Sequence, residues 1–192
     1  MLGSKTAGPA KDNPEKVYAF YDAFTDSNLN GRWTKNWGEW TVKKGVLLGK
    51  TDQTPSGDNA EIGIYVTKGT DWKDVHVELE MMETSDKQYP GPFLRVLDPS
   101  FSHTTAWWFE YWTKHPDCTM RPFKNNADGI WRYKANLPYP LKLHRWFHFT
   151  YKLNGNRFSQ WADGKLIQDN VQVENKWMIP KGTLGLGCHK MY

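Results

Sequence analysis

The feature that most constrains the fold is an alternating pattern that continues through two tight turns. Residues 146–153 alternate apolar and polar side chains, which is the period of a strand with one buried face. Asn154-Gly155 follows at once and is the strongest short signal for a β-hairpin. A second run, residues 157–161, leads through Asp163-Gly164 into residues 165–167. The pattern predicts three consecutive antiparallel strands.

The rest of the chain shows the same strand-like pattern and almost no helical period. Residues 75–81 alternate in the same way, and turn residues separate the other short runs. The further strand candidates are residues 18–24, 38–43, 45–50, 61–67, 92–97, 105–113, 130–134 and 183–188. Many short strands with regular turns predict an all-β fold, an antiparallel two-sheet β-sandwich or a barrel.

Two segments differ from this pattern. Residues 1–16 are polar and contain two prolines, which predicts a flexible N-terminal arm before a single β-sandwich domain over residues 17–192. Residues 114–145 contain four prolines, so we expect long loops there. Residues 1–16 lack the apolar segment of a secretory signal. Localisation therefore stays open, and is extracellular or periplasmic if a signal was removed.

Composition narrows the function classes. The mean hydropathy is −0.75, and no apolar run approaches the roughly 20 residues of a membrane span. The 11 Trp, 9 Tyr and 9 Phe are more rings than one domain of this size usually buries, so some are expected on a surface that uses them. Residues 97–192 hold 13 basic and 7 acidic side chains, which favours an anionic partner or a solvated face.

The two cysteines give no metal-binding pattern. Cys118 and Cys188 lie far apart in sequence and can form one disulfide at most. His103 and His115 have no ligand-spaced partner either. Ordinary structural roles are therefore expected for all four residues, with the pairing of the cysteines left open.

Seven segments carry motifs in a distinctive order: Gly38–Leu47, Trp72–Glu78, Phe93–Val96, Trp108–Tyr111, Arg145–His148, Leu153–Asn156 and Gly182–Leu186. This order resembles that of the concanavalin A-like lectin/glucanase superfamily. Within it, the chain is most similar to laminin G-like and 3-keto-disaccharide hydrolase-like domains. The resemblance implies a jelly-roll sandwich that binds its ligand on the concave face of one sheet.

The resemblance also implies two further features. Related domains often hold a structural Ca²⁺ at the edge of the sandwich, for which Asp22 or Asp26 would supply a carboxylate; no other cofactor is implied. They also carry a final strand near an F-D-N motif, whereas this chain ends at Tyr192. That strand is missing, replaced by the N-terminal segment, or donated by a partner, and an open sheet edge would favour a homo-oligomer.

Strand alternation selects the candidate ligand-binding residues. If Leu94 and Val96 point into the sandwich, Arg95 points outward, and the same reasoning applies to the other strands. The predicted outward group is Arg95, Trp108, Glu110, Trp112, Trp146, His148 and Gln160. Loop residues expected to close over it are Arg121, Lys124, Trp131, Arg132 and Tyr133.

This group favours a saccharide. Flat indole rings match the apolar faces of pyranose rings, and Arg, Gln and Glu reach hydroxyls. We therefore expect a carbohydrate-binding domain of lectin type that recognises an oligo- or polysaccharide. Arg95 together with Arg121 or Lys124 would also favour an acidic one.

Three alternatives stay open. The chain is a glycan-cleaving enzyme, a lyase or hydrolase, if Glu110 and His148 act as base and acid and Arg95 stabilises negative charge. It is a viral or surface assembly subunit if the sandwich serves only as a building block. In the third alternative, Trp108 and Trp112 are packed core rings, and Glu110 and Arg95 form a buried ion pair. Nucleic acid is disfavoured because no recognised binding module matches.

Overall fold

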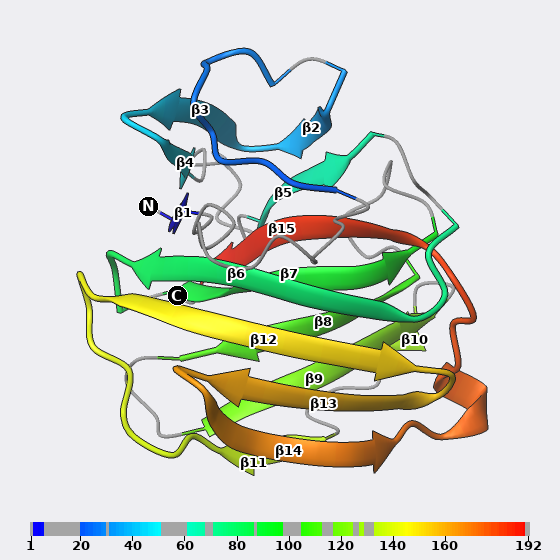
Figure 1. Ribbon diagram of the computed structural model, residues 1–192. Helices are drawn as coiled ribbons and strands as arrows, with labels where there is room; N and C mark the ends of the chain where they lie inside the picture. The colour runs from blue at the N-terminus through cyan, green and yellow to red at the C-terminus, as the bar shows by residue number, and fades with distance from the viewer. Residues whose placement is uncertain are drawn as a thin grey trace, which may run out of the picture.

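The computed structural model describes residues 2–5, 20–29, 31–50, 61–67, 71–86, 88–97, 105–112, 117–124, 127–128 and 133–190. They form two antiparallel sheets that pack face to face, one in front of the other in Figure 1. The all-β sandwich expected from the sequence is confirmed. No helix in the described residues is long and apolar enough to cross a membrane.

The first sheet has seven strands in the order β14-β13-β12-β6-β1-β4-β3. Its strands are β1 (Leu2–Lys5), β3 (Glu39–Lys43), β4 (Val46–Lys50), β6 (Val75–Glu83), β12 (Trp146–Asn154), β13 (Arg157–Ala162) and β14 (Lys165–Gln172). The two turns predicted at Asn154-Gly155 and Asp163-Gly164 join β12, β13 and β14 as expected.

The second sheet has eight strands, with β11 paired to β9 beside the order β10-β9-β8-β7-β15-β5-β2. Its strands are β2 (Trp33–Trp37), β5 (Glu61–Val66), β7 (Gln88–Val96), β8 (Ala106–Tyr111), β9 (Asp117–Lys124), β10 (Ala127–Asp128), β11 (Lys134–Asn136) and β15 (Thr183–Lys190). A short 3₁₀ helix, η1 (Asn175–Trp177), precedes β15.

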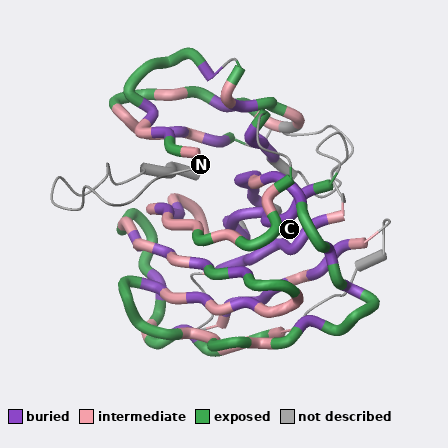
Figure 2. The backbone as a smooth tube through the Cα atoms, turned by 45° about the vertical axis from the view of Figure 1, so that its right-hand side comes forward, coloured by how far each residue is buried: buried purple, intermediate pink, exposed green. Residues whose placement is uncertain are grey.

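The core lies between the two sheets. Strand β12 buries every second side chain from Phe147 to Leu153, and the opposing strand β8 contributes Trp107, Phe109 and Tyr111. In Figure 2, strands of the seven-stranded sheet such as β12 alternate along their length between buried and more exposed positions. The alternation predicted for residues 146–153 is therefore confirmed.

The N-terminal segment departs from the expectation. Residues 2–5, predicted to lie in a flexible arm, form β1 in the middle of the seven-stranded sheet, where it pairs antiparallel with β4 and with β6. The prediction of a flexible arm was wrong for these residues, because their backbone groups complete two ladders. Residues 20–24, part of a predicted strand, have no strand structure.

The proline-rich stretch also departs from the expectation. Strand β9 lies inside residues 114–145, where we expected loops, although Pro122 cannot donate a ladder hydrogen bond. On its edge away from β8, strand β9 pairs with β11 at residues 117–119 and with β10 at residues 123–124. Pro122 thus lies between these two short pairings and opposite Trp107 of β8.

Candidate functional site

Both faces of the eight-stranded sheet are buried around β8. All six residues of β8 are buried, whereas β12 is buried only at alternate positions. Trp107 and Phe109 point to the core, so Trp108 and Glu110 point to the outer face of this sheet. Covered polar and aromatic side chains on an outer face are unusual, because such a face normally meets water.

A second apolar cluster, which we call the outer cluster, lies on this outer face. Trp108 stacks on Phe93 with ring centroids 4.6 Å apart and contacts Phe123 at 6.1 Å. The members of the outer cluster are Tyr65, Phe93, Val96, Ala106, Trp108 and Phe123. Trp108 is only 2% exposed. The indole face expected to meet a ligand is therefore covered by protein.

An ion pair borders the outer cluster. The Arg121 guanidinium donates Nη1–H to both carboxylate oxygens of Glu110, at 3.0 and 3.3 Å. It also lies over the rings of Trp108 and Phe123, at 5.5 and 5.1 Å. Glu110 is 2% exposed, so its charge is desolvated and depends on this partner. The sequence alternative that paired Glu110 with Arg95 is wrong, because Glu110 pairs with Arg121.

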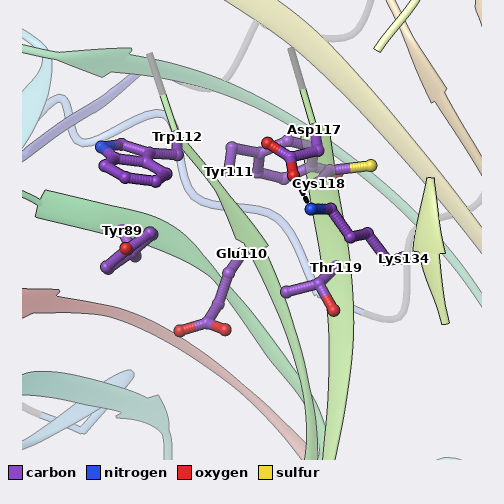
Figure 3. Close-up of a pocket in the computed structure, with 8 residues that line it drawn as sticks. All are labelled: Tyr89, Glu110, Tyr111, Trp112, Asp117, Cys118, Thr119 and Lys134. Carbon is purple, nitrogen blue, oxygen red and sulfur yellow. Dashed lines mark ion pairs between the residues drawn. The ribbon is translucent and has the colours of Figure 1, made fainter. Parts of the chain in front are cut away.

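Beside this pair lies a pocket, shown in Figure 3. The rings of Trp112 and Tyr89 form one side, with centroids 5.1 Å apart, and the ion pair of Asp117 with Lys134 forms the other. Glu110 and Thr119 lie between them. The lining residues are Tyr89, Glu110, Tyr111, Trp112, Asp117, Cys118, Thr119 and Lys134.

Two polar groups in the pocket indicate its chemistry. The Thr119 side chain is buried, and its hydroxyl has no hydrogen-bond partner among the described residues. A buried hydroxyl usually finds a partner, so this one is suited to a ligand or a water. Burial raises the pKa of the Tyr89 phenol, and the charges of Glu110 and Asp117 raise it further while Arg121 lowers it. Tyr89 is therefore a neutral hydrogen-bonding group at physiological pH.

Arg95 does not lie on this face. A β-bulge in the pairing of β7 with β15 makes Arg95 the extra residue, and its φ is 56°. The bulge reverses the alternation, so that Leu94 and Arg95 both face the interior while Val96 joins the outer cluster. The prediction that Arg95 points outward was wrong because simple alternation fails at a bulge.

Trp146 and His148 also lie elsewhere. They alternate on β12 with the core residues Phe147 and Phe149, so they face the outside of the seven-stranded sheet. Glu110 faces outward from the other sheet, and packed sheets are about 10 Å apart. Glu110, His148 and Arg95 therefore cannot act on one substrate as the enzyme alternative required.

Gln160 is buried in the interior. It accepts a hydrogen bond from the Tyr111 hydroxyl at 3.1 Å and donates to Gln168 and to the Cys118 sulfur. Cys118 and Cys188 are both buried and neither forms a disulfide, and burial raises the pKa of the Cys118 thiol to about 12. The sequence left their pairing open, and the structure shows no disulfide between them.

The remaining predicted loop residues do not close over the pocket. Lys124 ends β9 and alternates with Phe123 of the outer cluster, which places it toward the other face. The Tyr133 ring packs on Phe158, and its hydroxyl accepts a backbone hydrogen bond at 2.7 Å beside η1. Outside the described residues lie Trp131, Arg132, His103 and His115.

Asp22 does not fit the calcium site that the resemblance implied. Its Oδ1 accepts the backbone N–H of Phe24 and its Oδ2 accepts the indole N–H of Trp33, both at 2.8 Å. Arg32 lies 3.4 Å from Oδ1 and 2.9 Å from the carboxylate of Asp26. Protein donors thus occupy both carboxylates. Within the described part of the chain, no three His, Cys, Asp or Glu side chains are placed to hold a metal.

Sequence reasoning found part of the pocket and missed the rest. It named Glu110, Trp112 and Arg121, which the structure brings together with Trp108 on one face. The residues that it missed are Tyr89, Asp117, Thr119 and Lys134. The alternation of Cys118, Thr119, Met120 and Arg121 was a usable signal, but Pro122 argued against a strand there.

The fold defines a concanavalin A-like jelly-roll sandwich, as the motifs predicted. The chain belongs to the family of the 3-keto-alpha-glucoside-1,2-lyase-like domain, whose model matches residues 20–192. No curated protein matches the sequence.

Solved structures with the same fold include three carbohydrate-active or carbohydrate-binding proteins. The carbohydrate-binding module CBM66 from Bacillus subtilis is 16% identical, with a TM-score of 0.64, over 82% of this chain and 90% of that one. A prokaryotic lichenase from a mouse hindgut metagenome is 15% identical, with a TM-score of 0.62, over 88% and 84%. Laminarinase from Flavobacterium sp. UMI-01 is 9% identical, with a TM-score of 0.62, over 88% and 85%. The TM-scores establish a shared fold, and at these identities they establish the fold alone.

Proposed function

We propose that the chain binds a saccharide in the pocket beside Glu110. The observation that carries this proposal is the combination of the half-buried Trp112 ring, the buried Tyr89 ring beside it, and the buried and unpartnered hydroxyl of Thr119. Rings can cover the apolar face of a pyranose, while the Thr119 hydroxyl and the Glu110 carboxylate bind its hydroxyls. The carbohydrate-binding module and the glucanases that share this fold support the same class of ligand.

Replacing Trp112 by alanine tests the proposal. Loss of the ring that covers the sugar is expected to weaken binding about tenfold or more, which corresponds to about 1.4 kcal/mol. Isothermal titration calorimetry with cellobiose, laminaribiose and maltose measures the change. Trp146→Ala is the matched control, because that half-buried ring lies on the opposite face of the sandwich. Equal losses in both variants, or a loss only in Trp146→Ala, would exclude this pocket.

A second candidate is the elimination that the family name describes, and the placement of Glu110 beside Arg121 favours it. In a 3-keto glycoside, the carbonyl makes the proton on C2 acidic. A carboxylate takes that proton, the C1–O bond breaks, a C1=C2 double bond forms, and the leaving oxygen gains a proton from solvent. Glu110 is suited to the role of base, and Arg121 supplies positive charge beside it. Such a reaction needs one base rather than a pair of carboxylic acids.

The elimination has its own test. Glu110→Gln is expected to slow the release of the leaving group by about 100-fold or more, since general bases contribute 10²–10⁴-fold. The measurement is the rise in absorbance of the conjugated enone formed from a 3-keto disaccharide. Trp146→Ala serves again as the control with an unchanged rate. A wild-type rate in the folded Glu110→Gln protein would rule out Glu110 as the base.

A further inference from the structure

The charged groups around the pocket are paired with one another. Glu110 pairs with Arg121 at 3.0 Å, and Asp117 pairs with Lys134 at the pocket rim. Among the described lining residues, the ionisable side chains are two carboxylates, one ammonium group, the phenols of Tyr89 and Tyr111, and the Cys118 thiol. Arg95, which the sequence offered as a partner for acidic sugars, lies in the interior. Within the described part of the chain, the pocket thus has no excess of positive charge.

The titration of Tyr89 supports the same conclusion. After burial, the carboxylates of Glu110 and Asp117 raise the pKa of this phenol, and Arg121 offsets them in part. Tyr89 lies in the pocket wall, so it experiences the potential that a bound ligand would meet. The negative potential of Glu110 and Asp117 therefore disfavours a negative charge on a bound ligand.

We infer that the pocket selects uncharged sugar rings over carboxylated or sulfated ones, and that Glu110 and Asp117 set this selectivity. The inference rests on the saccharide-binding function proposed above. A carboxylate that leaves water needs a compensating cation. Among the described residues, Arg121 and Lys134 are the cations beside the pocket, and each is already bound to an acidic side chain. An acidic sugar would have to compete with Glu110 or Asp117 for them, whereas a neutral sugar would not.

The test compares sugars that differ only in charge. Cellobiose, laminaribiose and maltose are each paired with the same disaccharide oxidised to a carboxylate at C6 of the terminal ring. Calorimetry at low salt gives the ratio of the dissociation constant of the acidic sugar to that of the neutral sugar. The wild-type protein is expected to bind the neutral member at least about tenfold more tightly. Glu110→Gln removes the charge that neutralises Arg121, so the ratio should fall about tenfold.

A second variant keeps the test decisive if the first does not fold. Glu110 is buried, so thermal unfolding must show that Glu110→Gln is folded. Asp117→Asn instead releases Lys134, whose side chain is 55% exposed, and is expected to lower the ratio about threefold because solvent screens that charge. The Asp117→Asn result decides alone if Glu110→Gln does not fold.

The outcomes separate this inference from the proposed function. Trp112-dependent binding that is equal or tighter for the acidic sugars overturns the charge selectivity and leaves the saccharide site intact. A ratio that is unchanged in the folded variants overturns the roles of Glu110 and Asp117. Absence of Trp112-dependent binding for every pair overturns both the function and the selectivity.

Discussion

Replacing Gly91 by alanine is expected to prevent the native sandwich from forming. Gly91 lies in β7, where a Cβ atom would overlap the backbone carbonyl of Phe109 in the adjacent strand β8. A flexible side chain can move aside, but the backbone of β8 is held by its ladders to β7 and β9. We expect a loss of more than about 4 kcal/mol in the free energy of unfolding, which few single substitutions reach.

The matched control is Gly164→Ala in the turn between β13 and β14. Gly164 has a φ of 74° and nothing within 4 Å of an added Cβ, so only backbone strain is expected, about 1 kcal/mol. Urea unfolding followed by tryptophan fluorescence measures both variants. If Gly91→Ala were as stable as Gly164→Ala, β8 would not approach β7 as closely as the structure shows. The result also bears on the site, because Glu110 follows Phe109 and its position depends on this approach.

The sequence predicted the seven-stranded sheet better than the pocket. Strands β12, β13 and β14 follow one another, β12 and β13 each bury one face, and Gly155 and Gly164 mark the turns. Period and turn chemistry are local properties, so one sequence is enough to find them. The eight-stranded sheet is buried on both faces around β8, and alternation then no longer distinguishes inside from outside.

The candidate site was only partly predictable for a related reason. Alternation places residues on a face of one strand but does not say which sheet the strand joins. Trp108 and Trp146 were therefore assigned to one surface, although they belong to different sheets. Thr119 and Lys134 were missed because β9 and β11 acquire their pairing from tertiary contacts rather than from local propensity.

Arg95 shows the largest difference between the sequence prediction and the structure. Its replacement gives the second large expected effect. Nη1–H donates to the carbonyl of Ile179 at 2.7 Å, and Nε–H and Nη2–H donate to the carbonyl of Lys73 at 3.1 and 2.8 Å. The guanidinium lies 4.5 Å from the Trp107 ring centroid. Burial lowers its pKa, while the charge of Asp74 raises it. The side chain therefore connects β7 to the segments before β6 and before β15.

Arg95→Ala is expected to lower the free energy of unfolding by about 3–5 kcal/mol, because hydrogen bonds from a charged donor are worth about 1.5–3 kcal/mol each and a cavity remains. The control is Arg145→Ala, whose guanidinium also lies over a ring, that of Phe147 at 4.6 Å, and pairs with Asp163 at 2.9 Å. Its side chain is 52% exposed, so a loss of less than about 1 kcal/mol is expected. Urea unfolding measures both.

The same pair of variants decides between the two roles considered for Arg95. A side chain that contacts a sugar on an open face would leave stability almost unchanged when removed and would weaken saccharide binding. A side chain that joins two carbonyls in the interior would lower stability first, and binding would fall only as the folded fraction falls. Calorimetric binding measured well below the unfolding temperature separates the two cases. Normal stability with lost binding in Arg95→Ala would indicate that Arg95 contacts the ligand and would contradict its placement between the sheets.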